Sequence, residues 1–396
     1  MATMRKAYDV IVIGLGAMGS AALYQLSKRR VNVLGIEQFD IGHTFGSSHG
    51  DSRITRVAIG EGEEYVPLAG RSHEIWDEIR RDTGMKVLYR VGGLIMAVPD
   101  HGAMHDSDDF MGTTVRAAEK FGVAHAVLST DEIRRRFPQF NLVGDEQGYY
   151  EPGAGYLRPE LCIQAQLELA VENGVRYRTG EHVTHISPVR SDKVNVTTNK
   201  GEYEAGKVIV TTGSWISRFV PRRYKGLFGI YRQVLYWFNV RPDRYEDYMP
   251  GKFPIFIWEP GGGHEFLYGF PAINGPAGGV KVATEQAAVT TDPNSVDRHV
   301  SSREIEEMYE TNVAGRLPGL EGKCVKAAVC LYTKTPDSRF LIDIHPDYPN
   351  IIIASPCSGH GFKHSAAIGE SLAQLAVTGA STIDLNPFNF SRFSRQ

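Results

Sequence analysis

The chain has 396 residues, of which 42% are hydrophobic and 22% charged, so it is long enough for two domains or one large α/β domain with a sizeable core. The net charge of −3 gives no general attraction to nucleic acid or to an anionic membrane, and neither is expected as a partner. Four cysteines are too few for a disulfide framework, and no stretch reaches the roughly 18 apolar residues of a membrane span, so a cytoplasmic protein is expected.

The first 37 residues have the pattern of a βαβ unit. Residues 9–13 are short, β-branched and apolar, which is typical of a buried parallel strand. A glycine-rich turn follows at 14–19, and residues 20–28 have helical composition. Residues 31–36 predict a second strand, which ends at Glu37.

The rest of the chain alternates between helix-like and strand-like segments. Between 232 and 281 aromatic residues are dense and apolar residues alternate, which predicts an antiparallel sheet with one covered face. The other expected elements are helices at 65–81, 159–173, 296–309 and 366–376, and strands at 183–186, 194–197, 208–213 and 351–354. Elements of the nucleotide-binding type therefore occur at both ends, with the aromatic sheet between them.

The turn Gly14-Leu15-Gly16-Ala17-Met18-Gly19 has the spacing G-x-G-x-x-G. In this motif the first glycine permits the tight turn, the second lets the backbone approach a pyrophosphate, and the third lets helix and strand pack closely. Glu37 lies about 20 residues further on, where an acid binds a ribose hydroxyl. The turn predicts a dinucleotide site, but it does not decide between NAD and FAD.

Several longer blocks identify a family. They are residues 43–56, 60–62, 65–68, 268–271, 328–337 (Ala-Val-Cys-Leu-Tyr-Thr-Lys-Thr-Pro-Asp) and 358–363 (Ser-Gly-His-Gly-Phe-Lys). In these blocks the chain resembles the monomeric sarcosine oxidase and N-methyltryptophan oxidase family, in the same order and over almost its whole length.

The resemblance implies an α/β fold, with a Rossmann-like FAD-binding domain assembled from both ends of the chain and a mostly antiparallel β-sheet substrate domain. The implied FAD domain comprises 1–90, 150–225 and 322–396, and the substrate domain comprises 91–149 and 226–321. The implied activity is oxidation of the C–N bond of a small secondary amine, such as an N-methyl or other N-alkyl amino acid, to an imine. In the implied reaction, oxygen is then reduced to hydrogen peroxide and water hydrolyses the imine. The resemblance also implies a monomeric enzyme.

The resemblance also implies a covalent cofactor. Cys330, in Ala-Val-Cys-Leu-Tyr-Thr, matches the family cysteine that forms a thioether to a methyl group of the flavin. Cys324 lies six residues earlier and is the alternative attachment point. Cys162 and Cys357 lack this context and are expected in the core.

Five basic residues match catalytic positions of the family. Arg53 and His49 match residues beside the flavin ring, where positive charge favours the reduced flavin. Arg56 and Lys363 match the pair that holds the substrate carboxylate. Lys281 matches the lysine associated with oxygen activation. Amine deprotonation is expected on binding among the cations, since no protein base is identifiable.

One position departs from the pattern. Four residues after the lysine, the sarcosine oxidases have a histidine, and this chain has Glu285; a methionine near the family pocket corresponds to Ile257. A carboxylate there would raise the pKa of the bound amine or bind a second positive group. The sequence therefore favours a bulkier or basic N-alkyl amino acid over sarcosine.

Tyr268 and Tyr332 are expected to shape the substrate pocket, and no metal site is expected. The remaining cofactor contacts that the resemblance implies are Gly14, Gly16, Ala17, Met18, Gly19, Glu37, Gln38, Ser52, Arg53, Val183, Gly213, Gly359, His360, Gly361, Phe362 and Lys363.

Three other readings stay open at this point. An NAD-linked dehydrogenase would share the first βαβ unit, but it would need neither the C-terminal glycine-rich segment nor the cysteine. A flavoprotein that serves as a subunit of a larger amine-oxidising complex is the second. The third is a flavin dehydrogenase or oxidase that acts on a primary or cyclic amino acid or on a hydroxy acid.

Overall fold

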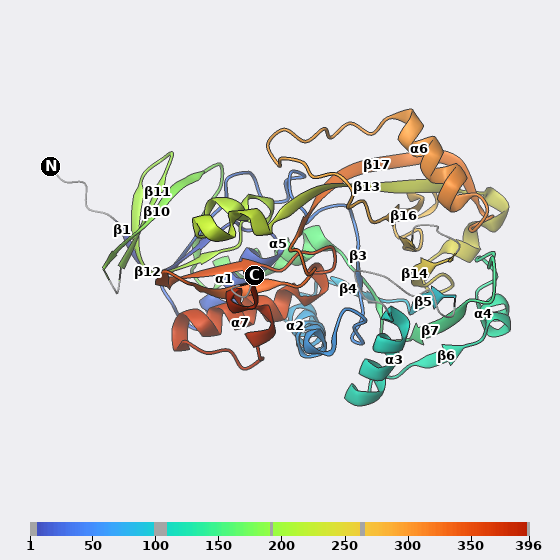
Figure 1. Cartoon of the computed structure of the whole chain (residues 1–396), viewed down its shortest axis with the longest axis horizontal. Coiled ribbons are helices and arrows are strands. Elements are labelled where there is room, and N and C mark those ends of the chain that lie inside the picture. The colour runs from blue at the N-terminus through green and yellow to red at the C-terminus, as the bar shows by residue number, and fades with distance from the viewer. Residues whose placement is uncertain (1–5, 99–108, 191–192, 262–265, 394–396) are drawn as a thin grey trace.

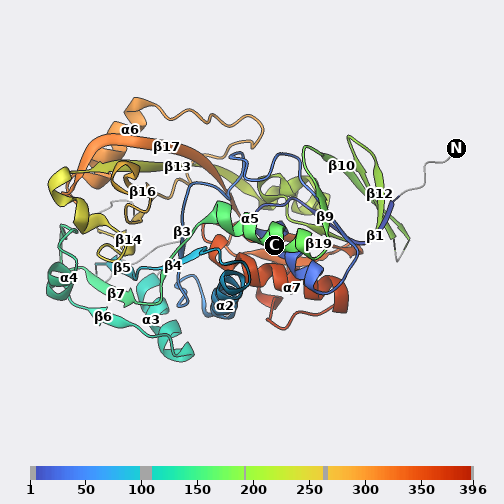
Figure 2. The same ribbon diagram turned by 180° about the vertical axis from the view of Figure 1, so that it is seen from behind.

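A computed structural model describes residues 6–98, 109–190, 193–261 and 266–393. Two groups of elements lie at opposite ends of an elongated molecule (Figure 1), and the same arrangement is seen from behind (Figure 2). The α-helices are α1 (Ala17–Lys28), α2 (Val66–Thr83), α3 (Phe110–Phe121), α4 (Thr130–Arg136), α5 (Pro159–Glu172), α6 (Ser302–Met308) and α7 (Ser365–Thr378).

The first sheet joins the two ends of the chain. Its strands are β10 (Val183–Arg190), β11 (Lys193–Thr198), β12 (Glu202–Val210), β1 (Lys6–Ile13), β2 (Val33–Ile36), β9 (Arg176–Arg178), β18 (Leu341–His345) and β19 (Tyr348–Ser355). β1 runs parallel to β2 and β12, and β12 runs parallel to β19. Strands from the N-terminal, middle and C-terminal parts therefore form one parallel core, as expected for strands that are apolar on both faces.

One face of this sheet is covered by helices. α1 packs against α5 and α7, and α2 packs against α5 and α7; Figure 2 shows α5, α2 and α7 near one another. α1 and α7 approach so closely that a Cβ on Gly369 would lie 2.3 Å from the Cβ of Ala21. Small residues at this crossing bring the C-terminal helix against the helix that follows the glycine turn.

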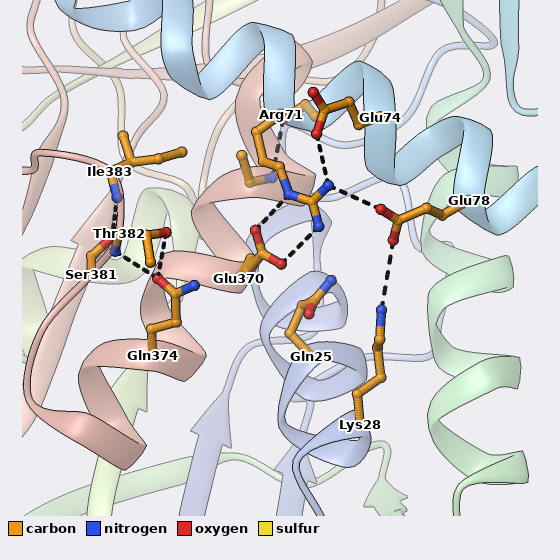
Figure 3. A network of polar contacts seen from close by, with 12 residues as sticks. Gln25, Lys28, Arg71, Glu74, Glu78, Glu370, Gln374, Ser381, Thr382 and Ile383 are labelled. Atoms are coloured by element: carbon orange, nitrogen blue, oxygen red, sulfur yellow. Dashed lines mark hydrogen bonds and ion pairs between the residues drawn. The ribbon is translucent and has the colours of Figure 1, made fainter.

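Charged side chains also join these helices (Figure 3). Arg71 of α2 forms a two-pronged contact with Glu370 of α7, at 2.8 and 2.9 Å. It also donates to Glu74 at 2.8 Å and to Glu78 at 2.9 Å, and Glu78 lies 3.6 Å from Lys28 of α1. These carboxylates hold the pKa of Arg71 well above its usual value, so its side chain stays charged. Arg71 thereby links α2 to α7 directly, and to α1 through Glu78 and Lys28.

The second sheet lies at the other end of the molecule (Figure 1). Its order is β17 (Leu320–Lys334), β13 (Gly229–Val240), β16 (Val280–Thr284), β15 (Leu267–Gly269), β14 (Ile255–Glu259), β5 (Gly93–Ala97), β7 (Gln147–Glu151) and β6 (Ala126–Leu128). All its pairings are antiparallel except β14 with β5. The aromatic residues predicted here form its core, where Phe140 packs on Phe253, Phe256 and Trp258.

A small third sheet contains β3 (Arg53–Thr55), β8 (Gly155–Leu157) and β4 (Leu88–Arg90), all antiparallel. Thr55 of β3 is buried, and its hydroxyl lies 2.7 Å from Nε2 of His73 on α2. Burial lowers the pKa of His73 to about 4, so its imidazole is neutral. β3 is thereby attached to α2, which matters because β3 begins at Arg53 and Arg56 follows it directly.

The predicted fold class is confirmed, with a Rossmann-like α/β sheet and a mostly antiparallel second sheet. One predicted helix is too long: residues 296–301 are not helical, and α6 begins at Ser302 because Ser301 and Glu304 form a capping box. β17 was not expected as a strand. The division of the chain into two domains stays a prediction. Among the described residues, no helix is long and apolar enough to cross a membrane.

Candidate active site

The glycine turn has the backbone that the motif predicts. Gly14 has φ +86°, and a Cβ there would lie 2.7 Å from the carbonyl oxygen of Thr211. A Cβ on Gly19 would lie 1.8 Å from the carbonyl oxygen of Gly14, so only glycine allows the helix to start this close to the strand. At Gly16 there is more room, and the neighbouring Ala17 N–H donates to the Ser48 hydroxyl at 3.3 Å. The N-cap residue Gly16 has no side chain of its own, and the N-terminus of α1 suits a phosphate.

Glu37 lies at the end of β2, and its side chain is 5% exposed. Its Oε2 accepts a hydrogen bond from the Leu15 backbone N–H at 2.7 Å, and Oε1 accepts from the Phe39 N–H at 3.1 Å. The acid therefore fixes the glycine turn from the neighbouring strand. Each carboxylate oxygen has a further lone pair with which it can accept a hydroxyl.

A single long cavity begins at this turn and continues to the second sheet. Most of the predicted residues line it: Gly14, Gly16, Ala17, Met18, Glu37, Gln38, Ser52, Arg53, Arg56, Val183, Gly213, Tyr268, Lys281, Cys330, Tyr332, Gly359, His360, Gly361, Phe362 and Lys363. Three do not: Gly19, which lies between helix and strand, His49 and Glu285.

Arg53 lines the cavity and supplies positive charge there. Its guanidinium donates to the backbone carbonyls of Ser52, at 2.8 Å, and Ser47, at 2.7 Å. His49 is buried nearby, and burial together with the charges of Arg53 and Lys281 lowers its pKa to about 3. His49 is thus neutral near pH 7, and of this pair only Arg53 is charged.

Arg56 and Lys363, which are 307 positions apart in the chain, meet at one carboxylate. Glu61 Oε2 lies 2.7 Å from Nη2 of Arg56, and Glu61 Oε1 lies 3.2 Å from Nζ of Lys363. All three line the cavity, with side chains that are 2–5% exposed. Burial lowers the pKa of Lys363 to about 8, and Glu61 opposes the shift.

Glu61 is a site residue that was not predicted from the sequence, although it lies in the family-like segment 60–62. An available signal was an acid between two glycines, five residues after an arginine. Glu151 was also missed. Its buried carboxylate accepts from the N–H groups of Val57 and Ala58 and from Tyr149, and so holds the backbone directly after Arg56. Burial raises the pKa of Glu151.

Lys281 is fully enclosed between the second sheet and the loop before β3. Its Nζ donates to the carbonyl oxygens of Gly50 and Ser52, both at 2.8 Å, and lies 3.2 Å from the Ser52 hydroxyl. The same nitrogen lies 4.5 Å from the centre of the Phe270 ring. Burial and the charge of Arg53 hold the pKa of Lys281 well below its usual value.

The two candidate cysteines on β17 differ in their burial and in whether they line the cavity. Cys330 lines the cavity and is 1% exposed, whereas Cys324 is half-buried elsewhere on the strand, and its thiol donates to the Lys326 carbonyl. Burial raises the pKa of the Cys330 thiol, and the charges of Arg53 and Lys281 oppose this. The cavity therefore favours Cys330 as the attachment point.

Tyr268 of β15 and Tyr332 of β17 close the cavity near Cys330, with their hydroxyls 3.4 Å apart. Burial raises the pKa of Tyr268 to about 12 and that of Tyr332 well above its usual value. Both hydroxyls are therefore protonated near pH 7.

The cavity suits a flavin dinucleotide on its own geometry. The N-terminus of α1, which follows the glycine turn, fits a pyrophosphate, and the acid Glu37 fits a ribose. The far end, with Arg53, Lys281 and Cys330, provides cations and a thiol at the place where a redox-active ring would lie. No group of three or more histidine, cysteine or acidic side chains suited to a metal occurs in the part of the chain that the structure describes.

Comparison with known proteins decides the family. Residues 9–375 match the family DAO, described as FAD dependent oxidoreductase. The chain belongs to this family. It is 40% identical over 395 residues to a monomeric sarcosine oxidase of Streptomyces avermitilis, covering 99% of both chains. It is 34% identical over 392 residues to the N-methyl-L-tryptophan oxidase of Escherichia coli, covering 98% of this chain and 99% of that one.

Two solved structures share the fold of this FAD dependent oxidoreductase. NikD, an amino acid oxidase of nikkomycin biosynthesis, superimposes with a TM-score of 0.81 at 22% identity and 97% coverage of both chains. The L-proline dehydrogenase of P. horikoshii has a TM-score of 0.80 at 21% identity and 99% coverage of both. The predicted family and the predicted use of FAD are confirmed, which removes the NAD-linked alternative.

Proposed function

We propose that this FAD-dependent oxidoreductase is an oxidase of a small secondary amine, an N-methyl or other N-alkyl amino acid. The observation that carries the proposal is the convergence of Arg56 and Lys363 on one carboxylate inside the cavity that begins at the glycine turn. A substrate carboxylate has the charge and shape of the Glu61 side chain that these two cations already hold. The 40% identical sarcosine oxidase supports the same substrate class.

The overall reaction balances with the amine, oxygen and water as its only reactants. The amine R–CH2–NH–R′ loses two electrons and two protons to become an imine, and oxygen gains both to become hydrogen peroxide. Water then cleaves the imine to a carbonyl compound and an amine. Bound FAD supplies the electron-accepting ring for this oxidation.

The residues of the chain position the amine and adjust its protonation. Arg56 and Lys363 bind the carboxylate, and Arg53 adds positive charge nearby. Three cations around one site disfavour a protonated amine, so the amine loses its proton to solvent as it binds. Tyr268 and Tyr332 shape the chamber, and Lys281 places an ammonium where charge develops on oxygen.

We also propose that FAD is attached through a thioether between Cys330 Sγ and a methyl carbon of the flavin. The bond forms with loss of two electrons and two protons, which oxygen accepts. Acid precipitation tests this: the wild-type pellet should be yellow, and Cys330→Ser should release the colour to the supernatant. Cys324→Ser is the matched control and should keep a yellow pellet. A yellow Cys330→Ser pellet would show that the linkage lies elsewhere.

Anaerobic flavin bleaching tests the substrate class. The panel contains sarcosine, N-methyltryptophan, cyclic imino acids, N-alkylated basic amino acids, primary amino acids and hydroxy acids. Fast bleaching by a secondary amine supports the proposal. Bleaching by primary amino acids or hydroxy acids alone contradicts it and favours the alternative chemistry on the same fold.

The electron acceptor needs a separate measurement. One peroxide per amine consumed in air supports an oxidase, whereas bleaching with slow reoxidation in air favours a dehydrogenase. We propose a cytoplasmic monomer, in keeping with four cysteines that form no disulfide. Sedimentation of the purified protein tests the monomeric state.

A further inference from the structure

A buried ion pair lies beside the cavity, next to the cavity-lining Gly359. Glu285 directly follows β16, and Lys334 is the last residue of β17. Glu285 Oε1 and Lys334 Nζ are 3.0 Å apart, and the two side chains are only 10% and 13% exposed. At this degree of burial, charge has strong effects on what binds nearby.

The position of Glu285 is fixed by the sheet. Gln233 of β13 is 1% exposed, and its side-chain amide binds the backbone of Gln286 through two hydrogen bonds. One of these, from the Gln286 N–H to Gln233 Oε1, is 2.9 Å long. Because Gln286 follows Glu285 directly, these hydrogen bonds fix the backbone beside Glu285.

The pair lies against the wall of the substrate chamber. Side chains alternate along a strand, so Cys330, Tyr332 and Lys334 of β17 share one face, and the first two line the cavity. A Cβ on the cavity-lining Gly359 would lie 3.6 Å from Glu285 Oε1 and 3.0 Å from the Tyr332 ring. The charge of Glu285 also raises the pKa values of Tyr268 and Tyr332.

We propose that the Glu285–Lys334 ion pair sets the charge preference of this chamber and selects N-alkyl amino acids whose side chains carry no net charge. The inference rests on the proposed function. A cationic side chain would have to compete with the tethered ammonium of Lys334 for Glu285, and an anionic one with Glu285 for Lys334. A charged side chain of either sign therefore gains little electrostatic attraction in the chamber, although it loses its hydrating water on binding.

The ion pair changes the substrate charge that was expected from the sequence. Glu285 alone suggested a basic substrate, because an unpaired buried carboxylate attracts a cation. Lys334 occupies that carboxylate from within the chain. A basic side chain therefore has no advantage over a neutral one.

Removing the charges singly and together tests the inference. The variants are Lys334→Met, Glu285→Gln, the double variant with both changes, and the charge swap Glu285→Lys/Lys334→Glu. The probes are three unreactive five-carbon acids that share a carboxylate for Arg56 and Lys363: valerate (neutral tail), glutarate (acidic tail) and 5-aminovalerate (basic tail). Affinities are measured by titration calorimetry and by the change in flavin absorbance.

The wild type should bind valerate most tightly. Lys334→Met should shift preference toward 5-aminovalerate by about tenfold relative to valerate, and Glu285→Gln should shift it toward glutarate by about tenfold. The double variant and the charge swap should regain the wild-type order. Equal preferences in all variants would overturn the inference, as would single variants that both shift in the same direction.

The double variant and the charge swap keep the test valid if a single variant does not fold, because neither leaves a charge unpaired. Bleaching rates with N-methyl-L-leucine, N-methyl-L-glutamate and Nα-methyl-L-lysine separate the two proposals. If none of them bleaches the flavin in any variant, the proposed function fails. The three acids still decide the charge preference in that case.

Discussion

Arg56 and Glu61 form an ion pair inside the cavity, with 2.7 Å between Nη2 and Oε2 and side chains that are only 2% and 5% exposed. Glu61 is also 3.2 Å from Lys363, so one internal carboxylate occupies both cations that we assign to the substrate. A substrate carboxylate must therefore compete with Glu61.

We expect Glu61→Gln to bind carboxylates at least tenfold more tightly, because the internal competitor becomes neutral. The ligand-free variant should also be less stable by about 3 kcal/mol, since two buried cations lose their counter-charge. Titration with valerate and thermal unfolding with and without valerate measure both effects. Weaker valerate binding in Glu61→Gln would contradict competition. Glu64→Gln, which changes a neighbouring acid outside the cavity lining, is the control.

Lys363 should give carboxylate binding a pH dependence. Burial lowers its pKa to about 8, so its positive charge is lost as the pH rises through this value. We expect the Kd for valerate to rise between pH 7 and 10, by up to about tenfold for each pH unit above the pKa. Lys363→Met should bind weakly across this range without the same rise. A Kd that is constant from pH 7 to 10 in the wild type would count against the role of Lys363.

The same shift affects stability in a defined direction. In the unfolded chain the pKa of Lys363 has its ordinary value of 10.5, so between about pH 8 and 10.5 the unfolded state binds more protons than the folded state. The contribution of this residue to the free energy of unfolding therefore increases with pH in that window. Urea unfolding of the wild type and of Lys363→Met at pH 7 and pH 10 measures this contribution to the free energy of unfolding.

Lys281→Met should slow reoxidation by oxygen far more than reduction by the amine. Lys281 Nζ donates to the carbonyl oxygens of Gly50 and Ser52, and in the role that we propose it stabilises negative charge that develops on oxygen. We expect a loss of roughly 10²–10³ in the reoxidation rate. Stopped-flow mixing of the reduced enzyme with oxygen measures it. Lys326→Met is the control, since Lys326 lies 4.6 Å from the Trp237 ring but does not line the cavity. Equal reoxidation rates in Lys281→Met and wild type would exclude the role.

Arg71→Met should destabilise the fold with little effect on the active site. Arg71 holds Glu370 of α7 by two hydrogen bonds and also contacts Glu74 and Glu78 (Figure 3). Its side chain is 28% exposed, so solvent weakens these contacts, and we expect a loss of about 1–2 kcal/mol. Urea unfolding measures it, and 1 M salt should reduce the difference. A large fall in bleaching rate with unchanged stability would contradict this role.

The local patterns could be predicted from the sequence because they depend on neighbouring residues. Gly14 and Gly19 allow a turn and a close helix–strand contact that other residues exclude, and the helices and core strands follow the spacing of apolar residues. The helix predicted at 296–309 was too long because the capping box of Ser301 and Glu304 outweighed helical composition. β17 was missed because residues 321–328, which follow the buried Leu320, are half-buried or exposed and lack an alternating pattern.

By itself, the sequence determined the cofactor family, the glycine turn and the identity of the cations. The tertiary structure decided which charges neutralise one another. Arg56 and Glu61 lie in the loop after β3, and Lys363 lies in the turn just before α7; they meet because β3 packs against that turn. Glu285 and Lys334 likewise meet through β13, which pairs with both β16 and β17. Sequence separation carries no information on such contacts, since packing and sheet pairing set them.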